Sequence, residues 1–193
     1  MPTRIVTEIF GNPVKVIQHK SDIIRTEVLR DFGGIYLDLD VIVFQPFDDL
    51  LYDDFTMALE EHIEPTLGNA IIIGRPFAPF LTRWIQGYKD FNDDEWSRHS
   101  TRLPYLISEE HGDDIHVLNT TAFFWPTWIR EHLNYDIYLR DLTPKSIKSV
   151  ETSFNRAIRK FLDYLPKDFN EEIVEQELNR GKNKKEGGEG SRY

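Results

Sequence analysis

The sequence predicts an α/β fold, and three features support that prediction. A nearly continuous apolar run of β-branched and aromatic residues at 35–44 is typical of a strand covered on both faces. Segments with apolar residues at helical spacing precede and follow this run, at 22–32 and 79–88. Apolar residues make up 40% of the 193-residue chain, which is enough for a buried core and excludes wholesale disorder.

The first half of the chain is predicted element by element. Short elements at 5–10 and 14–17 flank a Gly-Asn-Pro turn. Ser21 or Asp22 is expected to cap a helix that ends near Phe32, because Gly33 and Gly34 follow directly. The strand at 35–44 comes next, with tyrosine and two aspartates on one face and aliphatic residues on the other.

The second half is predicted to continue with strands at 56–60, 69–74 and 115–118, and with helices at 79–88, 103–110 and 153–162. An acidic loop is expected at 90–95. Residues 181–193 are polar and rich in glycine, so we expect a disordered tail after one domain at 1–180.

Composition excludes several classes of function. The net charge is −10, from 23 basic and 33 acidic residues, which disfavours a nucleic-acid-binding surface and favours a site that gathers cations. The chain has no cysteine, which excludes disulfides, thiolate zinc sites and cysteine nucleophiles. It has no apolar run long enough to span a membrane, and residues 1–6 lack the apolar core of a signal peptide.

Asp38 and Asp40 are the strongest chemical signal. Two carboxylates at i and i+2 on one strand point the same way, and they repel each other unless a cation lies near them. Oxygen ligands of this kind suit Mg²⁺ or Mn²⁺. A solvated strand end is the alternative reading of a bare Asp-x-Asp pair.

The surrounding sequence favours the functional reading. Asp22 and Arg25 are three residues apart on the predicted helix, so they share a face. The glycine pair then turns the chain directly into the strand with Asp38 and Asp40. One compact unit therefore offers an acid, a guanidinium group and a carboxylate pair.

This unit resembles the sugar-nucleotide site of the DXD-containing glycosyltransferases of family 32, whose pattern is Ser-Asp-x-x-Arg followed by Gly-Gly-x-Tyr-x-Asp-x-Asp. Every fixed position of that pattern is present between Ser21 and Asp40. Similarity to fungal members extends over roughly residues 7–165. Family 32 includes mannosyltransferases and enzymes similar to α-1,4-galactosyltransferase.

The resemblance implies a GT-A-like fold around a mixed, mainly parallel sheet, and a role for each matching residue. Asp22 and Arg25 would contact the nucleotide and donor sugar, with Asn69 lining the sugar pocket. Asp38 would bind ribose and sugar hydroxyls, and Asp40 would coordinate Mn²⁺ or Mg²⁺ on the diphosphate. Asp38 and Asp40 are thus the expected catalytic pair, and the new bond is expected to be formed with retention.

Two departures from the family pattern are visible. Only 21 residues precede Asp22, so the N-terminal part of a GT-A-like domain is expected to be lacking. A family segment with histidine, an aromatic residue and tryptophan is also absent near Asp136. We therefore expect weak transfer, or none, from the chain as it stands.

For several other candidate residues, a purely structural role is an alternative to a functional one. Trp96, His99 and Ser100 lie where family members contact substrate. His116 reads as an exposed strand histidine, and the cluster with Trp125 and Trp128 reads as core rather than as an acceptor platform. Asn119, Thr120 and Thr121 form a glycosylation sequon that matters only in the secretory pathway.

The leading hypothesis is a metal-dependent retaining glycosyltransferase that moves a sugar from a nucleotide-sugar donor to a glycan or glycolipid acceptor. The alternative is a catalytically inactive glycosyltransferase-like binding protein. A hydrolase built on Asp38 and Asp40 is disfavoured, because glycosidase carboxylates flank the bond they cleave. The resemblance implies the Golgi lumen as the location of such a protein.

Overall fold

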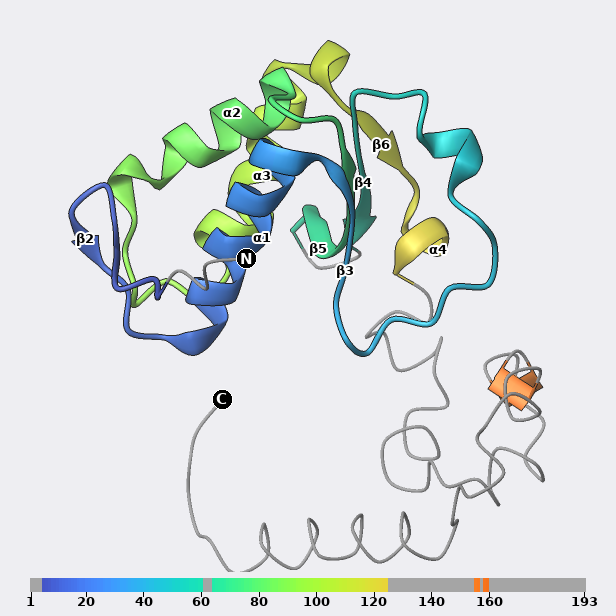
Figure 1. Cartoon of the computed structure of the whole chain (residues 1–193), viewed down its shortest axis with the longest axis horizontal. Helices are drawn as coiled ribbons and strands as arrows, with labels where there is room; N and C mark the ends of the chain where they lie inside the picture. The colour runs from blue at the N-terminus through green and yellow to red at the C-terminus, as the bar shows by residue number, and fades with distance from the viewer. Residues whose placement is uncertain (1–4, 61–63, 125–154, 157, 160–193) are drawn as a thin grey trace, which may run out of the picture. The chain divides into compact units, whose positions relative to one another are not determined.

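The computed structural model describes residues 5–60, 64–124, 155–156 and 158–159 (Figure 1). Contacts divide the chain into two units, Met1–Trp128 and Ile129–Tyr193. The elements below belong to the first unit. Apart from four helical residues at 155–156 and 158–159, the helix predicted at 153–162 lies outside the described residues, as do the tail at 181–193, Trp125 and Trp128.

The first unit opens with a small hairpin made of β1 (Glu8–Ile9) and β2 (Asn12–Pro13), which pair antiparallel. Phe10 and Gly11 connect them with φ angles of 48° and 82°. Two consecutive positive φ angles match the twist of a hairpin, and glycine adopts them without steric cost. The turn therefore sits one position earlier than the Gly-Asn-Pro prediction.

Helix α1 (Ile17–Phe32) starts earlier than predicted and ends where predicted. Neither Ser21 nor Asp22 caps it, because Asp22 is buried within the helix. Gly33 stops the helix with φ 63°, and its backbone N–H bonds to the Leu29 carbonyl at 2.8 Å. A Cβ at Gly33 would lie 2.5 Å from Pro76 Cδ, so both conformation and space require glycine there.

A four-stranded sheet has the order β3-β5-β4-β6. Its strands are β3 (Gly34–Leu37), β4 (Phe55–Glu60), β5 (Thr66–Gly74) and β6 (His116–Leu118). The sheet is mixed, as predicted, but the prediction that it is mainly parallel is wrong. Only β4 and β6 are parallel, whereas β5 is antiparallel to both β3 and β4. Too few residues separate β4 from β5 for the crossover that a parallel pair needs.

The strand predicted at 35–44 is the second correction. It ends at Leu37, because the chain turns at Asp38, whose carbonyl accepts a hydrogen bond from Val41 N at 3.2 Å. Strand β3 lies at an edge of the sheet rather than inside it. Ile35 is 39% exposed and Leu39 is fully exposed, so the apolar run is not covered on both faces.

In the described part of the first unit, seven further segments are helical. Helix α2 (Pro79–Gln86) continues into the 3-10 turn η2 (Gly87–Asp90), so the helix predicted at 79–88 is confirmed with a tighter end. The π-helical segment η3 (Arg98–Arg102) leads directly into α3 (Leu103–Glu110), which has the predicted bounds. Two more 3-10 turns, η1 (Asp48–Leu50) and η4 (Gly112–Asp114), and the short α4 (Thr120–Phe123) complete the unit.

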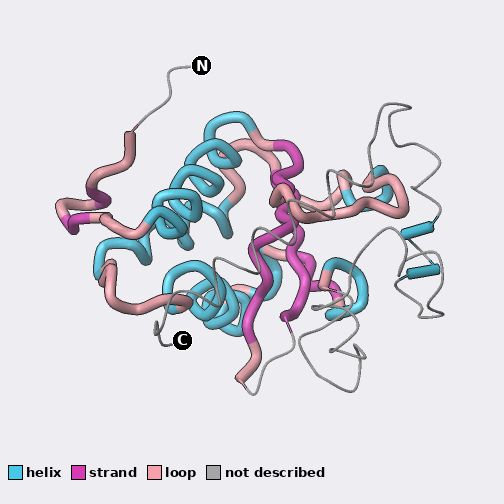
Figure 2. The backbone as a smooth tube through the Cα atoms, turned by 90° about the horizontal axis from the view of Figure 1, so that it is seen from below, coloured by secondary structure: helices cyan, strands magenta, loops and turns pink. Residues whose placement is uncertain are grey.

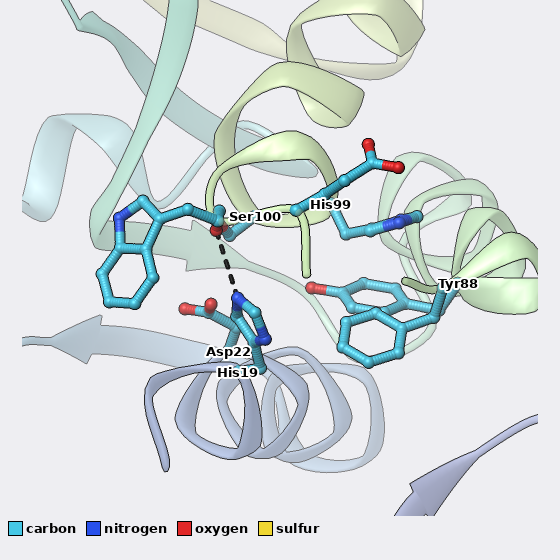
Figure 3. Close-up of a pocket in the computed structure, with 8 residues that line it drawn as sticks. His19, Asp22, Tyr88, His99 and Ser100 are labelled. Carbon is cyan, nitrogen blue, oxygen red and sulfur yellow. Dashed lines mark hydrogen bonds between the residues drawn. The ribbon is translucent and has the colours of Figure 1, made fainter. Parts of the chain in front are cut away.

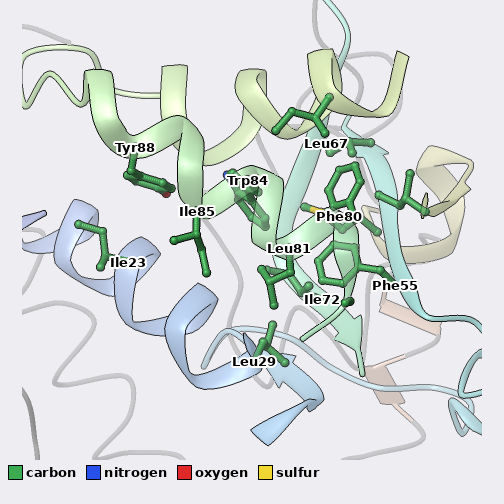
Figure 4. Close-up of a cluster of buried hydrophobic side chains, with 14 of the residues drawn as sticks. Ile23, Leu29, Phe55, Leu67, Ile72, Phe80, Leu81, Trp84, Ile85 and Tyr88 are labelled. Carbon is green, nitrogen blue, oxygen red and sulfur yellow. The ribbon is translucent and has the colours of Figure 1, made fainter. Parts of the chain in front are cut away.

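The hydrophobic core lies between one face of the sheet and the longer helices (Figure 4). Phe55 and Ile72 from the sheet face Phe80 and Trp84 from α2, and all four side chains are at most 1% exposed. Figure 2 shows the same layering, with the strands in magenta and most of the helical turns gathered to one side. In the described part of the chain, no helix is both long and apolar enough to cross a membrane.

Candidate functional site

Arg25 is the centre of a buried polar cluster between α1 and the edge of the sheet. The side chain is 6% exposed. Its Nη1 donates to the Asn69 carbonyl at 2.6 Å and lies 3.4 Å from Asp38 Oδ1. Its Nη2 lies 3.3 Å from Ser21 Oγ and 3.2 Å from Asp22 Oδ1. The predicted shared face of Asp22 and Arg25 is therefore confirmed, and a single guanidinium group joins α1 to β3 and β5.

Asn69 completes the cluster from inside β5. Its Nδ2 donates to Asp22 Oδ1 at 3.0 Å, so the residue has a place in the strand and not in a turn. Burial raises the pKa of Asp22, although Arg25, His19 and the Asn69 hydrogen bond oppose the shift. Desolvation therefore favours the neutral form of the Asp22 carboxyl group, whereas the Arg25 cation favours the charged form.

Tyr36 belongs to the cluster, although the site residues inferred from sequence do not include it. Its hydroxyl donates to Asp38 Oδ1 at 2.6 Å, and its ring centroid lies 4.6 Å from Arg25 Cζ. Burial and the bond to Asp38 raise the pKa of Tyr36. The signal was present in the sequence, because the two-residue period of a strand puts Tyr36 and Asp38 on one face.

An open hollow of about 660 Å³ adjoins the cluster. Its lining contains Ser21, Tyr36, Asp38 and Asp40, together with two leucines of the same segment, Leu37 and Leu39. Asp40 is exposed and lies in the turn after β3, so the prediction that it follows Asp38 along a strand is wrong. The turn nevertheless leaves both carboxylates on one hollow.

The charges around this hollow are predominantly negative. Asp38 and Asp40 line it, and Asp22 adds a third carboxyl group to the adjoining cluster, where Arg25 contacts Asp22 and Asp38. Both terminal nitrogens of Arg25 are already engaged, and its Nε is buried without a partner among the described residues. Arg25 therefore organises the cluster, while the carboxylates lining the hollow favour a cation.

A second, narrower pocket has Asp22 in its lining (Figure 3). It gathers the other substrate candidates, since Trp96, His99 and Ser100 all line it together with Tyr88. Trp96 is 64% exposed, whereas His99 and Ser100 are buried. The Tyr88 hydroxyl is buried without a hydrogen-bond partner in the described part of the chain. Asp22 is thus the residue that connects this pocket to the Arg25 cluster.

His116 lies apart from both pockets. It is an exposed residue of β6, as the strand reading predicted, and its Nδ1 lies 2.6 Å from Asp53 Oδ2. Strand β6 is the sheet edge opposite to β3. The structure therefore brings together Asp22, Arg25, Asp38 and Asn69, sets Asp40 on the adjoining hollow, and leaves His116 out.

Comparison with known proteins gives a family match over the first part of the chain. Residues 3–56 match the family model described as the glycosyltransferase sugar-binding region containing the DXD motif. That stretch contains α1, β3 and the aspartates of the hollow. Over this segment the chain is similar to the DXD-containing glycosyltransferases.

A curated relative of this glycosyltransferase-like chain is "Glucan organizing enzyme 1" of Cryptococcus neoformans. The two sequences are 35% identical over 198 residues, which cover 86% of this chain and 54% of the relative. The chain therefore spans about half the length of the relative. No solved structure matches this chain.

Proposed function

We propose that the hollow beside Asp38 and Asp40 binds a nucleotide-sugar donor together with a divalent cation, and that the chain belongs to a retaining glycosyltransferase acting on a glycan or glycolipid. The observation that carries this proposal is the Arg25 cluster, which fixes Asp38 at the edge of an open acidic hollow. The family match to the same segment supports it.

The protein's own groups have distinct tasks in this proposal. Asp38 is held by Tyr36 and Arg25, so its carboxylate can accept hydrogen bonds from sugar hydroxyls without reorienting. Asn69 and Asp22 hold each other at 3.0 Å and offer further polar groups to the sugar. Arg25 maintains this geometry rather than binding phosphate, because its terminal nitrogens are engaged.

The residues present fit a divalent cation that arrives with the donor. Asp40 is an exposed carboxylate on the hollow, which is the oxygen chemistry that Mg²⁺ and Mn²⁺ prefer. Within the described ranges, no group of three or more His, Cys, Asp or Glu side chains could enclose a metal ion. Asp40 would hold the cation, with Asp38 beside it. When bound, the cation neutralises charge on the diphosphate leaving group.

The decisive experiment compares Asp40→Asn with Asp49→Asn in the full chain. Asp49 is an exposed carboxylate on η1 that does not line the hollow, so it matches Asp40 in charge and exposure. Calorimetry with a panel of nucleoside-diphosphate sugars is run with Mn²⁺ and again with EDTA. We expect Mn²⁺-dependent binding in the wild type and in Asp49→Asn, and its loss in Asp40→Asn. Equal binding by all three proteins contradicts the proposal.

A binding protein without transferase activity is the second candidate, and one observation favours it. Asp38 is already occupied by Tyr36 and Arg25, and the described residues supply few further metal ligands. Donor hydrolysis and transfer to glycan acceptors, measured on the same proteins, separate the two candidates. Mn²⁺-dependent binding with no turnover above the Asp40→Asn background identifies the binding protein.

A luminal location, in the Golgi by resemblance, is part of the proposal. Nucleotide-sugar transferases that build glycans or glycolipids work beside those acceptors. The modification inferred below would report on that location independently.

A further inference from the structure

The sequence contains one Asn-x-Ser/Thr sequon, at Asn119, Thr120 and Thr121. In the structure it joins the end of β6 to the start of α4. Asn119 is exposed, with an extended backbone at φ −69° and ψ 162°. Neither the cluster around Arg25 nor the hollow uses this segment.

In the described part of the chain, modification of the Asn119 side chain would break no helix cap. Asn119 occupies the N-cap position of α4, yet its side chain makes no capping hydrogen bond. The side-chain hydrogen bond found for it among the described residues comes from Thr121 Oγ1, which donates to Asn119 Oδ1 at 2.6 Å. Within the described ranges, the amide Nδ2 of Asn119 makes no hydrogen bond to the protein.

We propose that Asn119 is an acceptor for N-linked glycosylation. In this reaction Asn119 Nδ2 attacks C1 of an oligosaccharide carried on a lipid diphosphate, and a new C–N bond forms. The C1–O bond to the diphosphate breaks, the lipid diphosphate leaves with the bonding electrons, and a base takes one amide proton. The host's oligosaccharide transferase supplies the catalyst and the lipid-linked donor.

The folded unit can carry a glycan at this position without disturbing the cluster. Transfer to a sequon occurs as the chain is made, so the folded structure decides whether the product is tolerated. Asn119 follows the edge strand β6, whereas Asp38 follows the opposite edge strand β3. Three interstrand spacings of about 4.8 Å separate these edges, on the order of 14 Å. Among the described strands β6 is an edge, and a glycan beside it would hinder pairing with other chains.

The test is expression of the full chain behind a cleavable secretory leader in a eukaryotic host. Only chains whose leader has been removed are analysed by intact mass, since cleavage shows that they reached the lumen. We expect a mass increase that peptide N-glycosidase removes. The increase should vanish in Asn119→Gln and Thr121→Ala, and it should persist in Thr121→Ser, which keeps the hydroxyl. Leader-cleaved chains without the increase overturn the proposal.

A second variant controls for access by the transferase. Asp94→Thr places a sequon at Asn92, an exposed residue in the loop after η2. Modification at Asn92 but not at Asn119 would show that the native sequon is refused, and would also overturn the proposal. The outcome is independent of donor binding, because none of these substitutions lies on the hollow.

Discussion

Arg25 shows how one side chain determines the geometry of the site. Its guanidinium contacts Ser21 and Asp22 on its own helix, Asp38 after β3 and the backbone of Asn69 in β5. A buried cation is costly unless its hydrogen bonds are satisfied, so these contacts are mutually dependent. Replacement of any one partner should be felt by the others.

Tyr36→Phe tests this dependence at the hydroxyl. The variant removes the 2.6 Å bond to Asp38 but keeps the ring beside Arg25. A hydrogen bond to a charged group contributes about 1.5–3 kcal/mol to stability, so we expect a loss of that order. Donor binding should also weaken, because Asp38 is no longer held by the hydroxyl. Tyr36→Leu also removes the cation–π contact and should lose more stability. Calorimetry and urea unfolding measure both effects. Wild-type affinity in Tyr36→Phe would contradict the assigned role.

His99 makes stability depend on pH. Burial, followed by the charge of Arg98, lowers the pKa of His99 below its ordinary 6.5. As pH falls below about 6.5, the unfolded chain takes up a proton that the folded chain resists, so the free energy of unfolding decreases. Asp22 contributes with the opposite sign, because its pKa is raised in the folded protein. Its contribution to stability is present below pH 3.8 and is lost as the pH rises through the pKa that Asp22 has in the folded state.

The variant His99→Gln isolates the histidine contribution. Urea unfolding of the variant and the wild type is compared at pH 8, 6.5 and 5. We expect the free energy of unfolding to fall less steeply with acidification in His99→Gln. Parallel pH profiles for the two proteins would show that His99 does not carry this dependence.

At the scale of elements, the start of α1 depends on a distant loop. Helix α1 has no side-chain cap of its own. Asp93 instead anchors the residues just before the helix, because its carboxylate accepts hydrogen bonds from Lys15 N at 3.0 Å and Val16 N at 3.3 Å and lies 2.9 Å from His19 Nδ1. Desolvation opposes the charge, but these hydrogen bonds hold the pKa of Asp93 below its ordinary value. These contacts hold the N-terminal end of α1, the helix that contains Asp22, against the loop that contains Asp93.

Asp93→Ala should therefore destabilise the protein by about 1–2 kcal/mol, the order expected for lost hydrogen bonds at a partly exposed site. Asp90→Ala is the matched control, since Asp90 is an exposed carboxylate nearby without the contacts to α1. Urea unfolding gives the free energies. Equal midpoints for the two variants would mean that the contacts of Asp93 contribute nothing to stability.

At the scale of the molecule, stability rests on the layer between the sheet and α2. Trp84 lies at its centre, 0% exposed, and its Nε1 donates to the His99 carbonyl at 2.7 Å. This bond links the core to the floor of the second pocket. Loss of the core should therefore disturb the site as well as the fold.

Trp84→Ala is expected to cost about 3–5 kcal/mol through lost burial and the cavity left behind. Trp96→Ala removes the same side chain from a position that is 64% exposed, and should cost less than about 1 kcal/mol. Fluorescence-detected urea unfolding compares the two. Similar losses in both variants would contradict the placement of the core.

Local patterns in the sequence predicted the part of the site that is close in the chain. The helix, the glycine stop and the short strand follow from spacing and backbone preference, and these place Asp22 and Arg25 beside Asp38. The resemblance added Asn69, and the structure gives it a hydrogen bond to Asp22. The roles of these residues toward a donor stay predictions.

Tertiary structure decided what depends on residues far apart in the chain. The residues that lead into α1 are held by Asp93, a contact that the sequence of the helix itself could not reveal. The apolar run after Tyr36 predicted a buried strand, but only the sheet order shows that β3 is an edge, where the chain is free to turn at Asp38. Hydrophobic periodicity indicates which face of a helix or strand is apolar and can therefore be buried. The partner that buries that face is set by long-range packing, and that packing ends β3 at Leu37 and leaves Asp40 on the open hollow.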